Sequence, residues 1–518
     1  MRKKAVSFVV SFMTVLVLIS FLNRAFADPL KLDVKEHAFK NGLKLLMLEK
    51  HDVPIVCVRI DYKVGSVDER PGITGVSHLF EHIMFKGTRM FGTRDYNAEK
   101  PLLDREDDLV IKIAAEKNNG DTADKKKIVA LEKELDDVRK KLRELVVKDE
   151  VFSLYLRQGA SGLNAATSTD GTYYFCDIPA NKLELWAFIE SDRMKNLVLR
   201  EFYSERDVVM EERRLRLENS PFGTLLEQLN ATAFVAHPYN WPTIGWRSDV
   251  QNITKAEVEE YIKRYYAPNN AVIVMVGDFN QAEAINLVEK YFGDIPAQSS
   301  PPKVKTVEPE QKGERRVEVE FDSNPYIAIA YHIPEIGHPD LYALDVVSSL
   351  LSAGRTSRLY KSLIEDKRIA VMAHASDEIG KYPDTFVFFA APRAPHTVAD
   401  VETAIYDEIE KLKTVPPSDW ELQKIKNQME ADFIMDLNSA SGLANEIGHF
   451  EVLSDWQFIN TFMDKIARVT ADDVMRVAKK YFTKTNRTVA VLVKKENNNN
   501  NKPKEIKEDN KSGKASVN

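Results

Sequence analysis

Residues 78–82 read His-Leu-Phe-Glu-His, a pattern that can bind a metal ion and use it. In an α-helix, residues four apart lie about 40° from each other, so His78, Glu81 and His82 would share one face. Two imidazole nitrogens can then hold zinc while the carboxylate reaches a water molecule on the metal. The alternative is an amphipathic helix with two incidental histidines. Glycine-containing segments on both sides bound a short helix around the motif and favour the zinc site.

A zinc ion bound by two histidines needs a third protein ligand and an open position for water. No third histidine lies at helical spacing from His82, so a carboxylate from another part of the chain is expected. The acidic helix predicted over residues 205–213 contains Glu205 and Glu212, which are seven residues apart and so lie on one face. Spacing alone leaves both residues open as the third ligand, and a solvated surface helix is the alternative.

The order of the motif, with Glu directly before the second His, resembles that of the pitrilysin/insulinase family of zinc metallopeptidases. The segment 75–88, GVSHLFEHIMFKGT, is similar to the signature helix of that family almost throughout. Further segments also fit the family pattern: Gly65–Glu69, Asn164–Ala165 ahead of Tyr173–Phe175, His237–Tyr239 and Tyr266–Asn270. The resemblance covers about residues 30 to 495, with specific motifs only in the first half.

The resemblance implies one Zn²⁺ per chain and assigns roles to five residues: His78, His82 and Glu212 as ligands, Glu81 as catalytic base, and Glu205 as a carboxylate that supports a ligand. Family members bind peptides as an added strand along the edge where Asn164 and Ala165 lie. In these proteins the Asn helps to place the scissile carbonyl group. The alternative for Asn164 is a simple turn residue.

The chain also contains an internal repeat. The segment 253–276 matches 469–492, with identical pairs such as Asn270 and Asn486. In each copy a threonine opens an amphipathic helix, a turn follows, and a β-rich run closes the unit. The long offset indicates duplicated domains rather than a solenoid. Because strand and helix signals mix without strict alternation, we expect an α+β fold of two homologous domains, each a mainly antiparallel sheet packed with helices.

One segment departs from the family pattern. The charged stretch 104–158 has a helical signal over 107–116 and apolar residues at heptad spacing from Leu131 to Leu145, which predicts a helical hairpin inserted in the first domain. A decorative insertion and a partner-binding or substrate-binding element are both open. The expected units are a signal peptide (1–27), a catalytic zinc peptidase domain (28–297), a linker (298–315), a second domain without a zinc site (316–494) and a disordered tail (495–518).

Composition and the N-terminus limit the classes of function. Met1–Lys4 and the apolar run after it are typical of a secretory signal, with a cleavage site before Asp28. We therefore expect an exported protein, in the periplasm or outside the cell, without a stable membrane span after cleavage; an uncleaved anchor is the alternative. The formal net charge of −7 disfavours nucleic acid as a partner. Only Cys57 and Cys176 are present, and the sequence leaves both a disulfide and two buried thiols open.

The second half lacks the histidine motif and is expected to form the opposite wall of a peptide chamber. The family resemblance implies an Arg and a Tyr, seven residues apart, that stabilise the tetrahedral oxyanion. Ile364 and Val371 occupy the corresponding positions of this chain. We therefore predict a heterodimer with a homologous chain that carries the Arg–Tyr pair, and a homodimer is the alternative.

Together these residues predict an exported zinc metalloendopeptidase that hydrolyses short or unfolded peptides, with Glu81 as general base. The alternative from a different class is a peptide-binding or chaperone-like subunit whose zinc is not catalytic. The intact Glu81 favours the enzyme, because a structural zinc site has no use for a base beside the metal.

Overall fold

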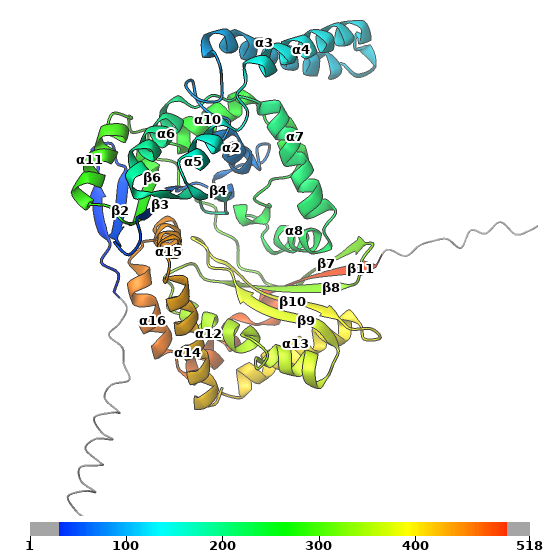
Figure 1. Ribbon diagram of the computed structural model, residues 1–518. Helices are drawn as coiled ribbons and strands as arrows, with labels where there is room; N and C mark the ends of the chain where they lie inside the picture. The colour runs from blue at the N-terminus through cyan, green and yellow to red at the C-terminus, as the bar shows by residue number, and fades with distance from the viewer. Residues whose placement is uncertain (1–30, 495–518) are drawn as a thin grey trace, which may run out of the picture.

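The computed structural model describes residues 31–494, so the predicted signal peptide and tail lie outside the described residues. The first half contains a six-stranded sheet in the order β1-β2-β6-β3-β5-β4, in which β2 and β6 are the parallel pair (Figure 1). Its strands are β1 (Lys35–Ala38), β2 (Lys44–Glu49), β3 (Ile55–Tyr62), β4 (Ser161–Thr167), β5 (Thr172–Pro179) and β6 (Ala271–Gly277). Strand β6 is buried on both faces, which explains its continuous apolar sequence.

The second half contains a five-stranded sheet in the order β7-β11-β8-β10-β9, in which β7 and β11 are the parallel pair. Its strands are β7 (Arg315–Phe321), β8 (Tyr326–Ile333), β9 (Ala370–Asp377), β10 (Asp384–Pro392) and β11 (Arg487–Lys494). Apart from β1, the two sheets have the same strand order and the same position of the parallel pair. Strands β2, β6, β3, β5 and β4 correspond to β7, β11, β8, β10 and β9. The predicted α+β fold of two homologous, mainly antiparallel domains is therefore confirmed.

Helices pack on both sheets. In the first half these are α2 (Val76–Met84), α6 (Leu183–Asn196), α7 (Phe202–Arg213), α8 (Pro221–Ala233), α9 (Arg247–Asn252), α10 (Lys255–Tyr265) and α11 (Gln281–Phe292). In the second half they are α12 (Leu341–Ser352), α13 (Val398–Thr414), α14 (Asp419–Asp436), α15 (Ala440–Leu453), α16 (Phe458–Arg468) and α17 (Ala471–Tyr481). Within residues 31–494, no helix is both long and apolar enough to cross a membrane.

The internal repeat is visible at the level of single hydrogen bonds. Helices α10 and α17 both begin with a threonine whose side chain and a following acid form a capping box. After each helix, an asparagine amide donates to a tyrosine carbonyl oxygen at 2.9 Å, from Asn270 to Tyr265 and from Asn486 to Tyr481. Residues that are identical in the two repeats therefore hold the same turn before the inner strands β6 and β11.

Each half contributes one helix that packs on the sheet of the other half. Helix α8 packs on β7, β8 and β11, where Leu225 and Leu229 are fully buried. Helix α15 packs on β3 and β6, where Ile447 joins a core that includes Val274 of the first sheet. Both helices have a serine N-cap three residues before a glycine. At Gly223, an added Cβ would lie 2.1 Å from a backbone oxygen, so the tight entry to α8 requires glycine.

The predicted helical insertion is present and projects from the first half (Figure 1). It consists of α3 (Tyr96–Lys117) and α4 (Lys125–Leu145), followed by α5 (Glu150–Arg157). The heptad seam packs against α3, with Val138 and Leu142 buried. Helix α3 is longer than the predicted 107–116, because Asp95 caps it by accepting hydrogen bonds from two backbone N–H groups.

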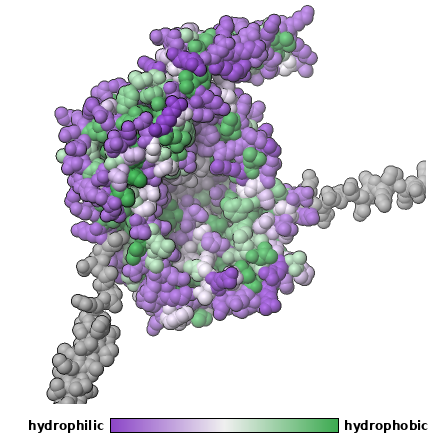
Figure 2. Space-filling model, in the orientation of Figure 1, coloured by the Kyte–Doolittle hydropathy of each residue, from purple (hydrophilic) through white to green (hydrophobic). Residues whose placement is uncertain are grey.

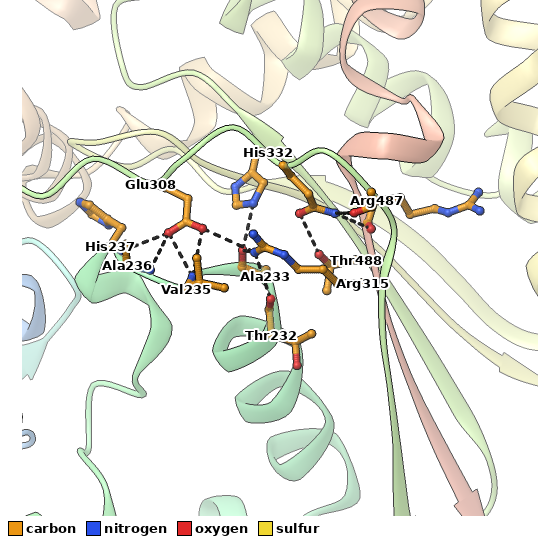
Figure 3. A network of polar contacts seen from close by, with 12 residues as sticks. Thr232, Ala233, Val235, Ala236, His237, Glu308, Arg315, His332, Arg487 and Thr488 are labelled. Carbon is orange, nitrogen blue, oxygen red and sulfur yellow. Dashed lines mark hydrogen bonds and ion pairs between the residues drawn. The ribbon is translucent and has the colours of Figure 1, made fainter.

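The segment predicted as a linker is held against the end of α8 (Figure 3). Glu308 accepts hydrogen bonds from the backbone N–H groups of Val235, Ala236 and His237 at 2.9–3.1 Å. Burial alone would raise the pKa of Glu308, but these donors lower it below its ordinary value. Arg315 donates to the last carbonyl oxygens of α8. These contacts fix the path of the chain between the two halves.

The two cysteines lie on neighbouring strands but on opposite faces of the first sheet. In the β3–β5 register, Cys176 pairs with Val58 and Cys57 pairs with Asp177. Cys57 therefore faces the core that α15 covers, and Cys176 faces the core that contains α2. Of the two possibilities that the sequence left open, the structure shows two buried free thiols.

We predict that protein purified without a reducing agent contains two free thiols per chain. Both should react with Ellman's reagent only after unfolding, because burial raises the thiol pKa and excludes the reagent. Titration in buffer and in guanidinium chloride measures this difference. Cys176→Ser serves as the control and should leave one thiol. Failure to detect thiols in the unfolded, unreduced protein would contradict the arrangement.

Candidate metal centre

Helix α2 carries the histidine motif and is fixed by a buried carboxylate at its start. Glu69 accepts hydrogen bonds from the backbone N–H groups of Gly75 and Ser77, at 2.7 and 2.8 Å, and from the Ser77 hydroxyl at 2.6 Å. Burial raises the pKa of Glu69 to about 8. The sequence singled out this residue only as part of a family-like segment. In the structure it anchors the N-terminus of the helix that presents the motif.

The three predicted zinc ligands come together in space. Glu212 Oε2 lies 3.7 Å from His78 Nε2 and 3.4 Å from His82 Nε2. One donor atom from each of the three residues lies within 4.8 Å of the others. The histidines come from α2 and the carboxylate from α7, which lies against α2. Of the two glutamates that spacing left open, the structure therefore places Glu212 beside both histidines.

This donor set fits zinc, for which two imidazoles and a carboxylate are common ligands. Burial lowers the pKa of His78 to about 4, which keeps its imidazole in the neutral form that binds metals. Burial would also lower the pKa of His82, but Glu205 and Glu212 raise it to about 9. A metal ion bound to His82 Nε2 would displace the proton that faces Glu212 and leave the Nδ1 proton that faces Glu205.

Glu205, predicted as a supporting carboxylate, lies on the Nδ1 side of the His82 ring. Its Oε2 is 3.5 Å from His82 Nδ1, and its Oε1 is 2.7 Å from Lys86 Nζ. Burial alone would raise the pKa of Glu205, but hydrogen bonds with His82 and Lys86 lower it. Lys86 was not singled out from the sequence, because a lysine four residues after the motif has no distinguishing pattern.

Glu81 points toward the edge strand of the first sheet. Its Oε2 accepts a hydrogen bond of 2.6 Å from the Thr167 hydroxyl, at the end of β4. Burial raises the pKa of Glu81 above its ordinary value. Strand β4 also carries Asn164, which is exposed, and Ala165, which is buried. Strand β4 is the last strand in the sheet order, so it has an unpaired outer edge, and it lies against the site helix α2.

A further charged residue near the site is Arg216, in a π-helical turn (Arg214–Glu218) that directly follows α7. Its guanidinium lies 3.0 Å from Glu212 Oε1, and its side chain is 73% exposed. Hydrogen bonding with His82 and the charge of Arg216 together lower the pKa of Glu212. Glu212 and Arg216 are four residues apart, the spacing at which helical periodicity places side chains side by side, and Arg216 lies in the π-helical turn. Such turns recur at functional sites.

The second half places no cation at the positions implied by the family resemblance. Ile364 lies in a helical turn and packs against the core, and Val371 lies on the edge strand β9 with 58% of its surface exposed. The nearby Arg358 pairs with Glu421 at 2.7 Å. His237, which begins one of the segments that fit the family pattern, is buried and accepts a hydrogen bond from the backbone of Tyr239.

Comparison with known proteins identifies relatives of the whole chain. The family model described as insulinase (peptidase family M16) matches residues 44–100, and the model for the peptidase M16 inactive domain matches residues 252–429. Zinc protease PqqE of Helicobacter pylori is 30% identical over 460 residues, which cover 88% of this chain and 91% of that protein.

A solved structure and a mitochondrial relative extend the comparison. The crystal structure of a protease from Helicobacter pylori has a TM-score of 0.76 and 29% identity, and the match covers 89% of this chain and 100% of that one. The probable mitochondrial-processing peptidase subunit beta of Arabidopsis thaliana is 24% identical over 458 residues, which cover 85% of this chain and 75% of that protein.

We predict that Glu205→Ala lowers zinc affinity by about 10- to 100-fold, because His82 loses the carboxylate that orients its ring. His78→Ala, His82→Ala and Glu212→Ala each remove a donor atom and should lower zinc content further. Competition with a chromophoric chelator measures the affinities.

Glu211→Ala is the matched control, since Glu211 lies on the same helix and pairs with Arg214 at the exposed surface. It should keep the zinc affinity of the unchanged protein. Equal affinities for Glu205→Ala and Glu211→Ala would show that Glu205 does not support the site. Full zinc occupancy in Glu212→Ala would show that the third ligand is misassigned.

Proposed function

Because this chain belongs to the insulinase family of zinc proteases (peptidase family M16), we propose that it is a metalloendopeptidase that hydrolyses short or unfolded peptides. The observation that carries this proposal is the placement of Glu81 next to the predicted ligands, with its carboxylate oriented by Thr167. A zinc site that served structure alone would gain nothing from such a carboxylate. The peptide-binding or chaperone-like alternative therefore has no support from this residue.

In the proposed reaction His78, His82 and Glu212 hold one zinc ion per chain. Bound there, zinc would polarise the scissile carbonyl group and lower the pKa of a coordinated water to about 7. Glu81 accepts the proton of the attacking water and later delivers it to the leaving amine. The Thr167 hydroxyl donates a hydrogen bond to Glu81 Oε2, so Oε1 is the oxygen that would accept the proton of the water. Because burial raises the pKa of Glu81, the carboxylate is a stronger proton acceptor than an exposed glutamate.

The proposed substrate position is the outer edge of β4. A peptide that adds to this edge as another strand gains main-chain hydrogen bonds with little sequence preference. The exposed Asn164 is then available to position the carbonyl group that is cut, and the small Ala165 leaves room for the peptide backbone. Thr167 links this strand to Glu81, so the peptide would pass the base at a fixed distance.

We expect the protein to act outside the cytoplasm and with a partner. Export rests on the N-terminal signal pattern, which lies outside the described residues. The expectation of a partner rests on Ile364 and Val371, whose side chains cannot donate hydrogen bonds to an oxyanion. A homologous chain with an Arg–Tyr pair would supply these donors in a heterodimer, and a homodimer is the alternative.

We predict that Glu81→Gln lowers kcat for a quenched fluorogenic peptide by about 100- to 10,000-fold while zinc content stays unchanged, because the amide cannot accept the proton. A chelator should abolish activity, and zinc should restore it. Glu211→Gln, an exposed change on α7, is the control. Zinc-loaded protein that binds peptides but never cleaves them, with its partner present, would instead support the peptide-binding alternative.

The partner proposal predicts low activity of the purified chain alone and a rise of about 100-fold or more on adding the homologous chain, because missing oxyanion donors typically cost this much in rate. Peptidase assays of each chain alone and of the mixture measure the difference. Replacing the Arg or Tyr of the added chain with Ala should remove the gain. High activity of the single chain, unchanged by its partner, would leave the homodimer.

A further inference from the structure

The inserted hairpin of α3 and α4 is attached to the segment that leads into α7, the helix that carries Glu205 and Glu212. The face of the hairpin that Figure 2 shows is mainly hydrophilic, and a small apolar core joins its two helices. Val198, from the loop before α7, is buried in that core beside Leu103 and Leu142. The hairpin therefore packs on the same stretch of chain that continues into the metal centre.

A buried ion pair forms a second attachment. Glu99 of α3 accepts hydrogen bonds from Arg200 Nε at 2.6 Å and from Arg200 Nη2 at 2.8 Å. The two side chains are 0% and 1% exposed. The same guanidinium donates to the carbonyl oxygens of Lys86, at 2.7 Å, and Thr88, at 2.9 Å, in the loop after α2. Through Arg200, the hairpin therefore also holds the loop that follows the histidine helix.

A third attachment lies in the first turn of α7. The Tyr203 hydroxyl donates a hydrogen bond to Asp107 of α3. From α4, the guanidinium carbon of Arg139 lies 5.9 Å from the centre of the Tyr203 ring, and Glu106 pairs with this guanidinium at 2.8 Å. Burial and the Asp107 carboxylate raise the pKa of Tyr203, so its hydroxyl remains a donor. Both helices of the hairpin thus contact one residue of α7.

The second and third attachments converge on Glu205. Tyr203 lies two residues before Glu205 in α7, and Lys86 belongs to the loop that Arg200 holds. Lys86 Nζ lies 2.7 Å from Glu205 Oε1, and Glu205 Oε2 lies 3.5 Å from His82 Nδ1. The hairpin therefore fixes both the helix that carries Glu205 and the loop that carries its cationic partner.

An open cavity beside these contacts limits what else can hold α7 in place. The cavity has a volume of about 280 Å³ and is lined by Leu142 and Arg143 of α4 and by Ser204 and Asp207 of α7. Because this space is not filled by close-packed side chains, the distance between the hairpin and α7 depends on the polar contacts at the start of the helix.

We propose that the inserted hairpin positions the metal centre, with Tyr203 and Asp107 as positioning residues that keep Glu205 against His82. The inference rests on the proposed function through its zinc site. It gives a role to the insertion, for which the sequence left decoration and binding of a partner or substrate open. The hairpin acts through α7, so its own residues need not touch the metal ion or the peptide.

The test is the zinc affinity of the full chain, measured by competition with a chromophoric chelator. Tyr203→Phe removes the hydroxyl and keeps the ring, so the contact with Arg139 remains. We expect the affinity to fall about 3- to 10-fold, the size of the effect of one hydrogen bond. Asp107→Ala should cause a similar loss. Asp107→Asn keeps an oxygen that can accept from the tyrosine hydroxyl and should retain most of the affinity.

A double-mutant cycle separates positioning from a general weakening of the fold. If Tyr203 acts through Glu205, Tyr203→Phe should lower zinc affinity in the unchanged protein and cause no further loss in the Glu205→Ala background. A purely structural role would instead lower the thermal midpoint of the zinc-free protein and leave zinc affinity unchanged. Equal losses in both backgrounds, or unchanged affinity in Tyr203→Phe and Asp107→Ala, would overturn the proposal.

Tyr291→Phe is the matched control. Tyr291, on α11, also donates its hydroxyl to a carboxylate, that of Glu184, at 3.0 Å. Its loss should leave zinc affinity unchanged, because neither residue contacts α7 or the loop after α2. Glu99→Gln is unsuited to the test, since it would leave the buried charge of Arg200 unpaired and destabilise the whole fold.

This inference and the proposed function fail in different ways. Zinc affinity that falls in His78→Ala but not in Tyr203→Phe would reject positioning by the hairpin and leave the peptidase proposal intact. A Tyr203→Phe effect that depends on Glu205, in a protein that never cleaves peptides with its partner present, would support positioning and reject the peptidase function.

Discussion

The exchange of helices between the two halves determines the rest of the structure. Helix α8 closes part of the second sheet, and α15 closes the outer face of the first, so neither core is complete without the other half. The exchange also positions the metal centre. Glu212 lies near the end of α7, and the chain runs directly from α7 through the turn that carries Arg216 into α8. Glu212 therefore lies on a helix that packs on α2 and continues into a helix packed on the second sheet.

Charge pairing explains how the ligand set keeps its shape. Glu205 and Glu212 each direct Oε2 toward His82, and each directs Oε1 to a cation, Lys86 and Arg216 respectively. In each carboxylate, one oxygen therefore faces His82 and the other pairs with a lysine or an arginine. Because the cations offset the two negative charges, His82 can remain between two acids in a largely buried pocket.

The sequence was most informative where function depends on local periodicity. Helical spacing placed His78, Glu81 and His82 on one face, and the family resemblance added Glu212 and Glu205, all of which the structure brings together. The internal repeat correctly predicted two homologous sheets. Identical residues in the two copies, such as Asn270 and Asn486, form the same hydrogen bond in the same turn.

Contacts between distant segments could not be predicted in the same way. The hydrogen bond from Thr167 to Glu81 depends on how β4 lies against α2, which the periodicity of either segment does not specify. The cysteines show the same limit. The sequence left the pairing of Cys57 and Cys176 open, because their relative position depends on a register that sets Cys57 opposite Asp177. A shift of one residue in that register would have placed both thiols on one face.

Duplication followed by divergence accounts for the difference between the halves. Both sheets end in an edge strand, β4 in the first half and β9 in the second. At β4, helix α2 brings a base and two imidazoles to the edge, whereas α12, the helix that follows β8, is aliphatic over most of its length. Since α8 leaves the β9 end of its sheet uncovered, an open cavity lies there. The two copies of one fold thus differ in chemistry: the first carries the predicted metal ligands on α2, and the second carries a largely aliphatic helix in the corresponding place.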